Sequence, residues 1–477
     1  MHTTTTRLNT LVAKKNNTGD DMIRVWSCWI VRPKALLLAS QWLLLAAVLS
    51  CIAWGYQSHS PFGSLHANAG VIILLVTLQI CCYANGLASV IVAPSVKLFV
   101  AKALVSLGMG LLLITPLFVA FPGLFPGYGW AASAVLLSTV CLLILRPLLC
   151  WLIRRKKFGE GLLILGTGDL AGKFRKELAN LQLLDANPPL HLGTANSASD
   201  QGAVINYEEL RAITLRERIS RIVVAEADAH NSKDLAVALL DCKLAGLAVE
   251  QASESYEQLS EKIWLEALRP ESLLYSEGFR PSKHYLLLKR AYDALCALLI
   301  IIVSAPLLAV IGILVKLDSA GPILLRQVRV GLHGKEFVLL KFRTMRQDAE
   351  VQTGPVWACQ HDKRMTRVGK YLRKYRLDEL PQAFNVLRGE MSLVGPRPER
   401  PYFVELLSAE IPYYGLRHSV NPGITGWAQV LYPYGASVKD AYEKLQYDLY
   451  YAKHMSLGFD LRILLSTVQV VLFGRGQ

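Results

Sequence analysis

Two adjacent carboxylates, Asp378 and Glu379, follow a stretch of the chain that is dense in lysine and arginine. A divalent cation takes oxygen ligands, and guanidinium groups bind phosphate oxygens. A carboxylate pair among cations therefore indicates a site for a divalent metal and a multiply charged phosphate substrate. Asp-Glu dipeptides also occur on solvated surfaces, so the prediction depends on the motifs that surround this one.

A basic amphipathic helix is predicted to carry this pair, from about Met365 to Leu380. Val368, Tyr371, Leu372, Tyr375 and Glu379 fall near one face, and Lys370, Arg373, Lys374 and Arg376 populate the other. A helix of this kind lies naturally at an anionic membrane surface. A second amphipathic helix is predicted near the C-terminus, from Leu461 to Phe473.

A long apolar segment from Ala294 to Val315 precedes this region and contains Ser304 and Pro306 near its centre. Proline removes a backbone donor and bends a helix. Basic residues flank both ends of the segment, so both ends favour the cytoplasmic face. We expect a helix that enters one leaflet, breaks at Pro306 and returns; a kinked span is the alternative.

Four further apolar segments are long enough to cross a bilayer, which takes about 20 helical residues. They run over residues 35–55, 71–93, 103–121 and 130–153. Basic residues precede the first segment, lie between the second and third and follow the fourth, whereas the other two loops have none. Both ends of this bundle therefore face the cytoplasm. No ionisable side chain lies at mid-span, which favours an anchor or scaffold over a transport pathway.

The composition agrees with a membrane protein, because 52% of the 477 residues are hydrophobic and only 18% are charged. Membrane sidedness and a phosphate-rich substrate explain the net charge of +14. A nucleic-acid partner is not predicted, because the basic residues are not interleaved with stacking aromatics. The nine cysteines form no CxxC pair and no spacing suited to zinc.

Strand-like and helical runs alternate between residues 158 and 276, which favours an open parallel α/β sheet. A GxGxxA loop from Gly166 to Ala171 follows the first strand, and such a loop can bind a pyrophosphate. The acidic residue expected after the second strand is missing, because the strand at Leu190 to Thr194 is followed by no carboxylate before Asp200. A structural or regulatory Rossmann-like domain is therefore favoured over a dinucleotide site, and it is a candidate module for a homodimer.

The C-terminal region carries an ordered series of motifs. They read KRAYD from Lys289, GP at Gly321, QVRVG from Gln327, GK at Gly334, KFRTM from Lys341, LRKYRLDELPQ from Leu372, SLVGPRPE from Ser392 and PGITGW from Pro422. This order resembles the bacterial sugar transferases, the monotopic polyprenyl-phosphate phosphoglycosyl transferases. The four spans and the Rossmann-like domain resemble the long-form members, which start exopolysaccharide repeat units.

The resemblance implies a membrane protein on the cytoplasmic face of the bacterial inner membrane. Its fold class would be an α-helical four-span bundle, an α/β Rossmann-like domain and a mostly α catalytic domain with a re-entrant membrane helix and amphipathic interfacial helices. The expected boundaries are 1–34 for a cytosolic leader, 35–157 for the bundle, 158–276 for the Rossmann-like domain and 285–477 for the catalytic domain, with the re-entrant helix at about 289–316.

The implied reaction moves a phosphosugar from a UDP-sugar, with UDP-glucose as the default, to undecaprenyl phosphate and leaves UMP. Asp378 would attack the β-phosphate to form an aspartyl intermediate, assisted by Glu379 and by Mg²⁺ bound to the two carboxylates. Arg397, flanked by two prolines, would hold the donor phosphates. Secondary phosphate-binding candidates, each equally compatible with a structural ion pair, are Lys335, Arg343 and Arg376. Ala305 stands where many relatives have serine, so Ser304 is expected to cap the break by bonding back to a freed carbonyl.

The sequence favours two other functions less. A membrane-anchored, NAD-dependent nucleotide-sugar dehydratase would use the Gly166 loop and needs an internal Tyr/Lys pair, but the YxxxK match from Tyr285 to Lys289 lies outside that domain. A scaffold of polysaccharide export would carry polar residues within its spans or a long periplasmic domain, and the sequence shows neither.

Overall fold

The computed structural model describes residues 161–268 with gaps, most of 278–346 and 364–472, and scattered residues before 161. The first and fourth predicted spans lie outside the described residues, and the second and third are described only in part. Thr167 and Gly168 of the GxGxxA loop also lie outside them. The chain forms two compact units, Met1–Ser255 and Tyr256–Gln477.

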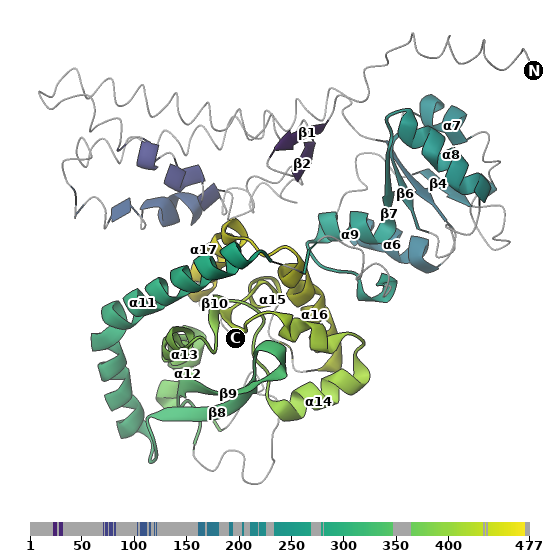
Figure 1. Cartoon of the computed structure of the whole chain (residues 1–477). Helices are drawn as coiled ribbons and strands as arrows, with labels where there is room; N and C mark the ends of the chain where they lie inside the picture. Colours follow the sequence, from purple (N-terminus) through teal and green to yellow (C-terminus); the bar gives the residue numbers. More distant parts are fainter. Residues whose placement is uncertain are drawn as a thin grey trace, which may run out of the picture. The chain divides into compact units, whose positions relative to one another are not determined.

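The first unit contains a short antiparallel hairpin, β1 (Met22–Val25) and β2 (Cys28–Val31), and a five-stranded parallel sheet. The sheet order is β5-β4-β3-β6-β7 (Figure 1). Its strands are β3 (Gly161–Leu165), β4 (Leu190–Gly193), β5 (Ala203–Val204), β6 (Ile219–Val224) and β7 (Ala248–Gln251). The helices around it are α6 (Asp169–Asn180), α7 (Leu210–Arg216) and α8 (Lys233–Leu244). An open parallel α/β sheet is therefore present, as the alternation predicted.

The central strands β3 and β6 explain why this sheet forms. Leu163, Ile164, Ile222 and Val223 are at most 1% exposed. Parallel strands covered by helices on both faces need apolar side chains in both directions, so they appear as continuous aliphatic runs.

A single long helix, α11 (Lys283–Asp318), organises the second unit. Its first turn is capped by Ser282, whose Oγ accepts a hydrogen bond from the Tyr285 amide. Among the described residues, α11 is the one helix that is long and apolar enough to cross a membrane. Apolar side chains along it face outward, including Leu287 (72% exposed), Val303 (77%) and Leu317 (78%).

The helix α11 stays continuous across Pro306 instead of breaking there, and Figure 1 shows it changing direction along its length. Ser304 Oγ donates to the Ile300 carbonyl at 2.6 Å. A back-bond of Ser304 is therefore present, but it is not the predicted bond to a freed carbonyl. It reaches the carbonyl of Ile300 and not that of Ile302, which is the one that loses its amide partner at Pro306. The prediction that the helix breaks at Pro306 is wrong, because the flanking hydrogen bonds keep the helix continuous around one missing backbone donor.

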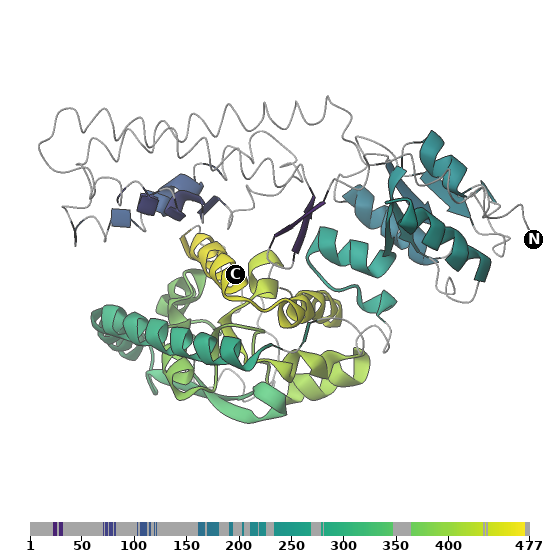
Figure 2. The same ribbon diagram turned by 45° about the horizontal axis from the view of Figure 1, so that its top comes forward.

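The remaining elements of this unit are short strands, α-helices and 3-10 turns (Figures 1 and 2). The strands are the antiparallel hairpin β8 (Leu324–Val330) and β9 (Glu336–Phe342) and the parallel pair β10 (Ser392–Val394) and β11 (Gly423–Thr425). The α-helices are α12 (Arg367–Lys374), α13 (Gln382–Arg388), α14 (Pro401–Glu410), α15 (Trp427–Leu431), α16 (Val438–Lys453) and α17 (Leu457–Leu472). Short 3-10 turns are η4 (Leu265–Ala267), η5 (Leu332–Gly334), η6 (Leu377–Glu379) and η7 (Tyr414–Ser419).

Both arms of α11 attach to this same unit. In the N-terminal arm, Ala297 joins the main core with Leu339, Val386 and Trp427. In the C-terminal arm, Ile311 and Val315 pack with residues of β9 and α12. Both arms of α11 therefore pack against one folded unit.

The division between the two units falls between Ser255 and Tyr256, inside α9 (Ala252–Ser260), and earlier than the boundary expected from the sequence. Ile263 and Leu265 enter an apolar cluster with Phe403 and Leu407 of α14. The Glu261 carbonyl also accepts a hydrogen bond from Trp427 Nε1 at 3.0 Å. The segment that follows Tyr256 therefore packs with the C-terminal region.

Candidate active site

The carboxylate pair lies on the 3-10 turn η6, and not on the helix predicted for residues 365–380. The helix α12 ends at Lys374, and Arg376 adopts a left-handed conformation with φ 52°. Leu377 and Leu380 then pack into the apolar cluster of α11, which fixes the turn between them. No glycine or proline stands at this break, so the helical spacing of apolar residues predicted one helix across it. The prediction that Glu379 shares a helical face with Val368 is therefore wrong.

Glu379 is 7% exposed and is held in its ionised form. Its Oε1 accepts a hydrogen bond from the Arg397 guanidinium at 2.8 Å. Burial alone would raise the pKa of Glu379, but Arg397 and Arg376 outweigh burial and lower it. Glu379 therefore remains a carboxylate in this environment.

Asp378 is equally buried, at 7% exposure, and its pKa moves the other way. Burial and the negative charge of Glu379 raise the pKa of Asp378, and Lys341, Arg373 and Arg397 offset this only in part. The pKa values of two neighbouring carboxylates commonly separate in this manner, because like charges at one site disfavour ionisation of both groups. Asp378 is thus a basic, poorly solvated carboxylate facing several cations, which suits a nucleophile that attacks phosphorus.

Lys341 is the site residue that the sequence reasoning did not select. It lies on β9 with Phe342 after it, and its ammonium interacts with Asp378, Arg329 and Arg397. Burial and the neighbouring Arg329 lower the pKa of Lys341 to about 8. One signal could have found it, because a lone lysine in the apolar run from Phe337 to Phe342 has to be compensated by charge.

Arg376 and Arg397 both lie close to the dyad, and their phosphate-binding roles stay predictions. Arg376 donates to the Gln429 side-chain oxygen of α15 at 2.9 Å, so its guanidinium is fixed on a second element. Glu379 interacts with both guanidinium groups. The site therefore combines η6, α15, β9 and the segment after β10.

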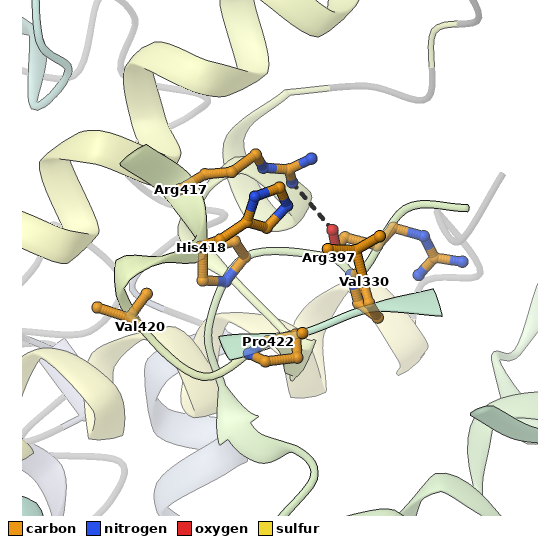
Figure 3. A pocket seen from close by; sticks show the side chains of 9 residues that line it. Val330, Arg397, Arg417, His418, Val420 and Pro422 are labelled. Carbon is orange, nitrogen blue, oxygen red and sulfur yellow. Dashed lines mark hydrogen bonds between the residues drawn. The ribbon is translucent and has the colours of Figure 1, made fainter. Parts of the chain in front are cut away.

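The backbone around Arg397 is held from two sides. Arg417 donates to the Arg397 carbonyl at 2.9 Å and to Asp448 at 2.7 Å, and both side chains of that ion pair are buried. Arg329 donates to the Pro398 carbonyl at 2.9 Å. Figure 3 shows the Arg397 side chain directed away from Arg417, so Arg417 positions the peptide and leaves the guanidinium to the dyad.

Arg343 and Lys335 lie elsewhere. The Arg343 guanidinium donates to the carbonyls of Ser319 and Ala320, at 2.7 and 2.8 Å, and so caps the C-terminal end of α11. Lys335 is exposed in the turn between β8 and β9, at the end of β9 remote from Lys341. Neither shows a contact with the dyad among the described residues. Their predicted phosphate-binding roles stay predictions.

The YxxxK match has a structural role in the second unit. Lys289 donates to Asp460 at 2.7 Å, and the Tyr285 hydroxyl donates to the same carboxylate at 3.3 Å. Tyr451 also donates to Asp460, at 2.7 Å. The pair thus anchors the start of α11 to α17.

The described part of the chain contains no group of three or more His, Cys, Asp and Glu side chains that could hold a metal ion. The dyad alone offers two carboxylates. Mg²⁺ is commonly held by one or two carboxylates together with the phosphates of a substrate, so this donor set fits a cation that arrives with a diphosphate.

The C-terminal region is similar to known proteins. Residues 284–474 match the family model described as bacterial sugar transferase. UDP-N-acetylgalactosamine-undecaprenyl-phosphate N-acetylgalactosaminephosphotransferase of Aeromonas hydrophila is 42% identical over 238 residues, 50% of this chain and 55% of that protein. UDP-glucose:undecaprenyl-phosphate glucose-1-phosphate transferase of Escherichia coli K12 is 45% identical over 188 residues, 38% of this chain and 39% of that protein.

A third relative, exopolysaccharide production protein PSS of Rhizobium leguminosarum bv. phaseoli, is 40% identical over 188 residues, which cover 94% of its length. The chain spans little more than half of the Aeromonas protein and about two-fifths of the Escherichia protein. The Aeromonas match is longer than the family match and extends to the N-terminal side of residue 284. These matches, together with the dyad and its cations, show that the chain belongs to the bacterial sugar transferase family.

Proposed function

We propose that this protein transfers a hexose-1-phosphate from a UDP-sugar to undecaprenyl phosphate, giving undecaprenyl-diphosphate-sugar and UMP, as the initiating step of exopolysaccharide biosynthesis. The observation that carries the proposal is the pair Asp378 and Glu379, whose pKa values move in opposite directions inside one cluster of cations. The names of the relatives from Aeromonas, Escherichia and Rhizobium support the substrate classes and the pathway.

The reaction would proceed in two displacements at Asp378. A carboxylate oxygen attacks the β-phosphorus of the donor, and the bond from that phosphorus to the bridging oxygen breaks, so that UMP leaves. A phosphate oxygen of the lipid acceptor then attacks the same phosphorus and releases the Asp378 carboxylate. Arg397 and Lys341 offset the negative charge that gathers on the phosphoryl oxygens in both displacements.

We include Mg²⁺ in the proposal, held by Glu379 and Asp378 together with the donor diphosphate. When bound it would neutralise charge on the phosphates. Arg397 keeps the Glu379 carboxylate ionised and oriented, which is the state that a hard cation requires.

We further propose that α11 is a re-entrant membrane helix and that the second unit lies on the cytoplasmic face of the inner membrane. The bend of α11, its exposed apolar side chains and the attachment of both arms to one unit support this placement. In the same proposal the four N-terminal segments form an anchor, and the parallel sheet is a Rossmann-like structural or regulatory domain. A homodimer through that domain stays a prediction.

The test is release of UMP by solubilised protein with undecaprenyl phosphate and Mg²⁺, from a panel that contains UDP-glucose, UDP-galactose and UDP-N-acetylgalactosamine. UDP-glucose is the default donor. Asp378→Asn should abolish release, whereas Asp440→Asn, in the capping box of α16, should retain it. Release of UDP instead of UMP, or equal release by Asp378→Asn, would contradict the proposal.

A further inference from the structure

An open apolar groove of about 580 Å³ runs along the C-terminal arm of α11. Leu308, Gly312 and Ile313 line it from α11, and Phe342, Pro381 and Phe384 line it from β9 and the start of α13. Lys316 is the one charged residue among the described lining residues. Its volume is in the range of small-molecule sites, roughly 300–1,000 Å³.

The groove is joined to the dyad by two short pieces of chain. Pro381 lies two residues after Glu379, and Leu380 between them packs against the same arm of α11. Phe342 directly follows Lys341, the cation that interacts with Asp378. The groove therefore begins at residues that adjoin, along the chain, the groups that would bind the head of a ligand at Asp378.

The lining is exposed although it is apolar. Ile313 is 60% exposed, Phe384 40% and Ile323 39%. Contact of such a surface with water is unfavourable, and exposed contiguous apolar patches mark lipid, ligand or partner sites. Leu314 and Leu317 on the same arm of α11 are also exposed, and in the proposed orientation they would lie among lipid chains.

We propose that this groove holds the first isoprene units of the acceptor's polyprenyl chain, so that the acceptor phosphate is delivered to Asp378 from the membrane side. The inference rests on the proposed function. A methyl-branched, flexible apolar chain that ends in a phosphate matches a groove that is apolar along its length and ends next to a cluster of cations. Bilayer acyl chains are the competing occupant, and the test separates the two.

Gly312 gives a direct way to fill the groove. A Cβ at Gly312 would lie 3.5 Å from the Ile323 side chain, which is an ordinary contact, so a larger side chain there projects into the groove without a backbone clash. Val310 is 52% exposed on the same arm and does not line the groove. Gly312→Phe and Val310→Phe are therefore matched variants that add bulk at neighbouring positions.

The experiment compares undecaprenyl phosphate with a two-isoprene prenyl phosphate in mixed micelles, at fixed surface concentration and saturating UDP-sugar. Gly312→Phe should raise KM for the long acceptor about tenfold, the loss expected when about two methylene groups lose their burial. Its KM for the short acceptor should also rise, because the first isoprenes are displaced, whereas Val310→Phe should change neither KM by more than about twofold. Unchanged KM values in Gly312→Phe would overturn the proposal and leave the groove to bilayer lipid.

A second measurement uses wild-type protein and does not depend on a variant that folds. A prenyl phosphate with a photoreactive diazirine in its second isoprene should label peptides that contain Leu308, Ile313 or Phe384, and excess undecaprenyl phosphate should remove the label. Labelling that is confined to other helices, or that excess phospholipid removes equally, would overturn the proposal. If wild-type protein releases UMP but shows such labelling, the groove assignment fails and the proposed function stands; if no UDP-sugar yields UMP, the function itself fails.

Discussion

Replacement of Lys341 by arginine should remove the alkaline limit of the reaction. In the free protein, burial and Arg329 lower the pKa of Lys341 to about 8, from an ordinary value of 10.5. In the proposed mechanism the protonated form offsets phosphoryl charge, so activity should be present below this pKa and lost as pH rises through it. An arginine stays charged, since its pKa lies above about 12.

The size of the effect follows from this pKa. With a value of about 8, about nine-tenths of Lys341 side chains are protonated at pH 7 and about one-tenth at pH 9. The kcat/KM for the UDP-sugar should therefore fall about ninefold to tenfold between these two pH values, because kcat/KM reports groups of the free enzyme. The alkaline decrease of kcat should lie at higher pH than that of kcat/KM, since a bound diphosphate favours the charged lysine.

The assay is the initial rate of UMP release between pH 6 and pH 9 at low UDP-sugar and saturating lipid acceptor. Lys341→Arg should have a lower but flat alkaline side, and Lys341→Met should have little activity at any pH. At the acid end both active forms should lose rate as Asp378 becomes protonated, and this loss begins above the ordinary range for aspartate because its pKa is raised. A wild-type profile that stays flat to pH 9, or an alkaline limb that persists in Lys341→Arg, would refute the assignment of Lys341.

Three other outcomes are expected. Arg397→Ala removes the partner of a buried dyad carboxylate and, in the proposed mechanism, a group that binds phosphate, so kcat/KM in the UMP assay should fall about 10²- to 10³-fold; a loss below tenfold would contradict its role. Arg417→Met leaves Asp448 buried and unpaired after loss of a 2.7 Å ion pair, which should cost about 3–5 kcal/mol in thermal unfolding, and Arg417→Met with Asp448→Leu should unfold at a higher temperature than either single variant. Gly369→Ala places a Cβ 2.2 Å from the Thr344 carbonyl oxygen and should destabilise the protein by about 1–3 kcal/mol; an unchanged unfolding temperature would mean that the start of α12 can shift at no cost.

Local sequence patterns were sufficient to predict several helices and strands. The aliphatic runs at Gly161 and Arg221 predicted β3 and β6, and the apolar run from Ala294 predicted the greater part of α11. The helix predicted from Leu461 corresponds to α17, which begins at Leu457. These features are local, because apolar periodicity and unbroken apolar length are properties of one continuous segment. The Asp-Glu pair among basic residues was likewise visible in the sequence.

The tertiary structure decided what each charged side chain does. Arg343 and Lys341 stand two residues apart in one motif, yet Arg343 caps the end of α11 while Lys341 interacts with Asp378. Arg376 breaks the predicted helix by taking a left-handed conformation that its own residue type does not favour. Packing of Leu377 and Leu380 on α11 stabilises that turn.

The physical reason is the reach of the interactions. Spacing along a segment tells which residues share a face, whereas a pKa, an ion pair or a helix cap depends on groups brought together from distant parts of the chain. By itself the sequence determined the order of the family's motifs, the main helices and strands, and the identity of the dyad. Only the folded chain decided that Lys341 and Arg397 surround that dyad, that Arg343 does not contact it, and that an apolar groove begins beside it.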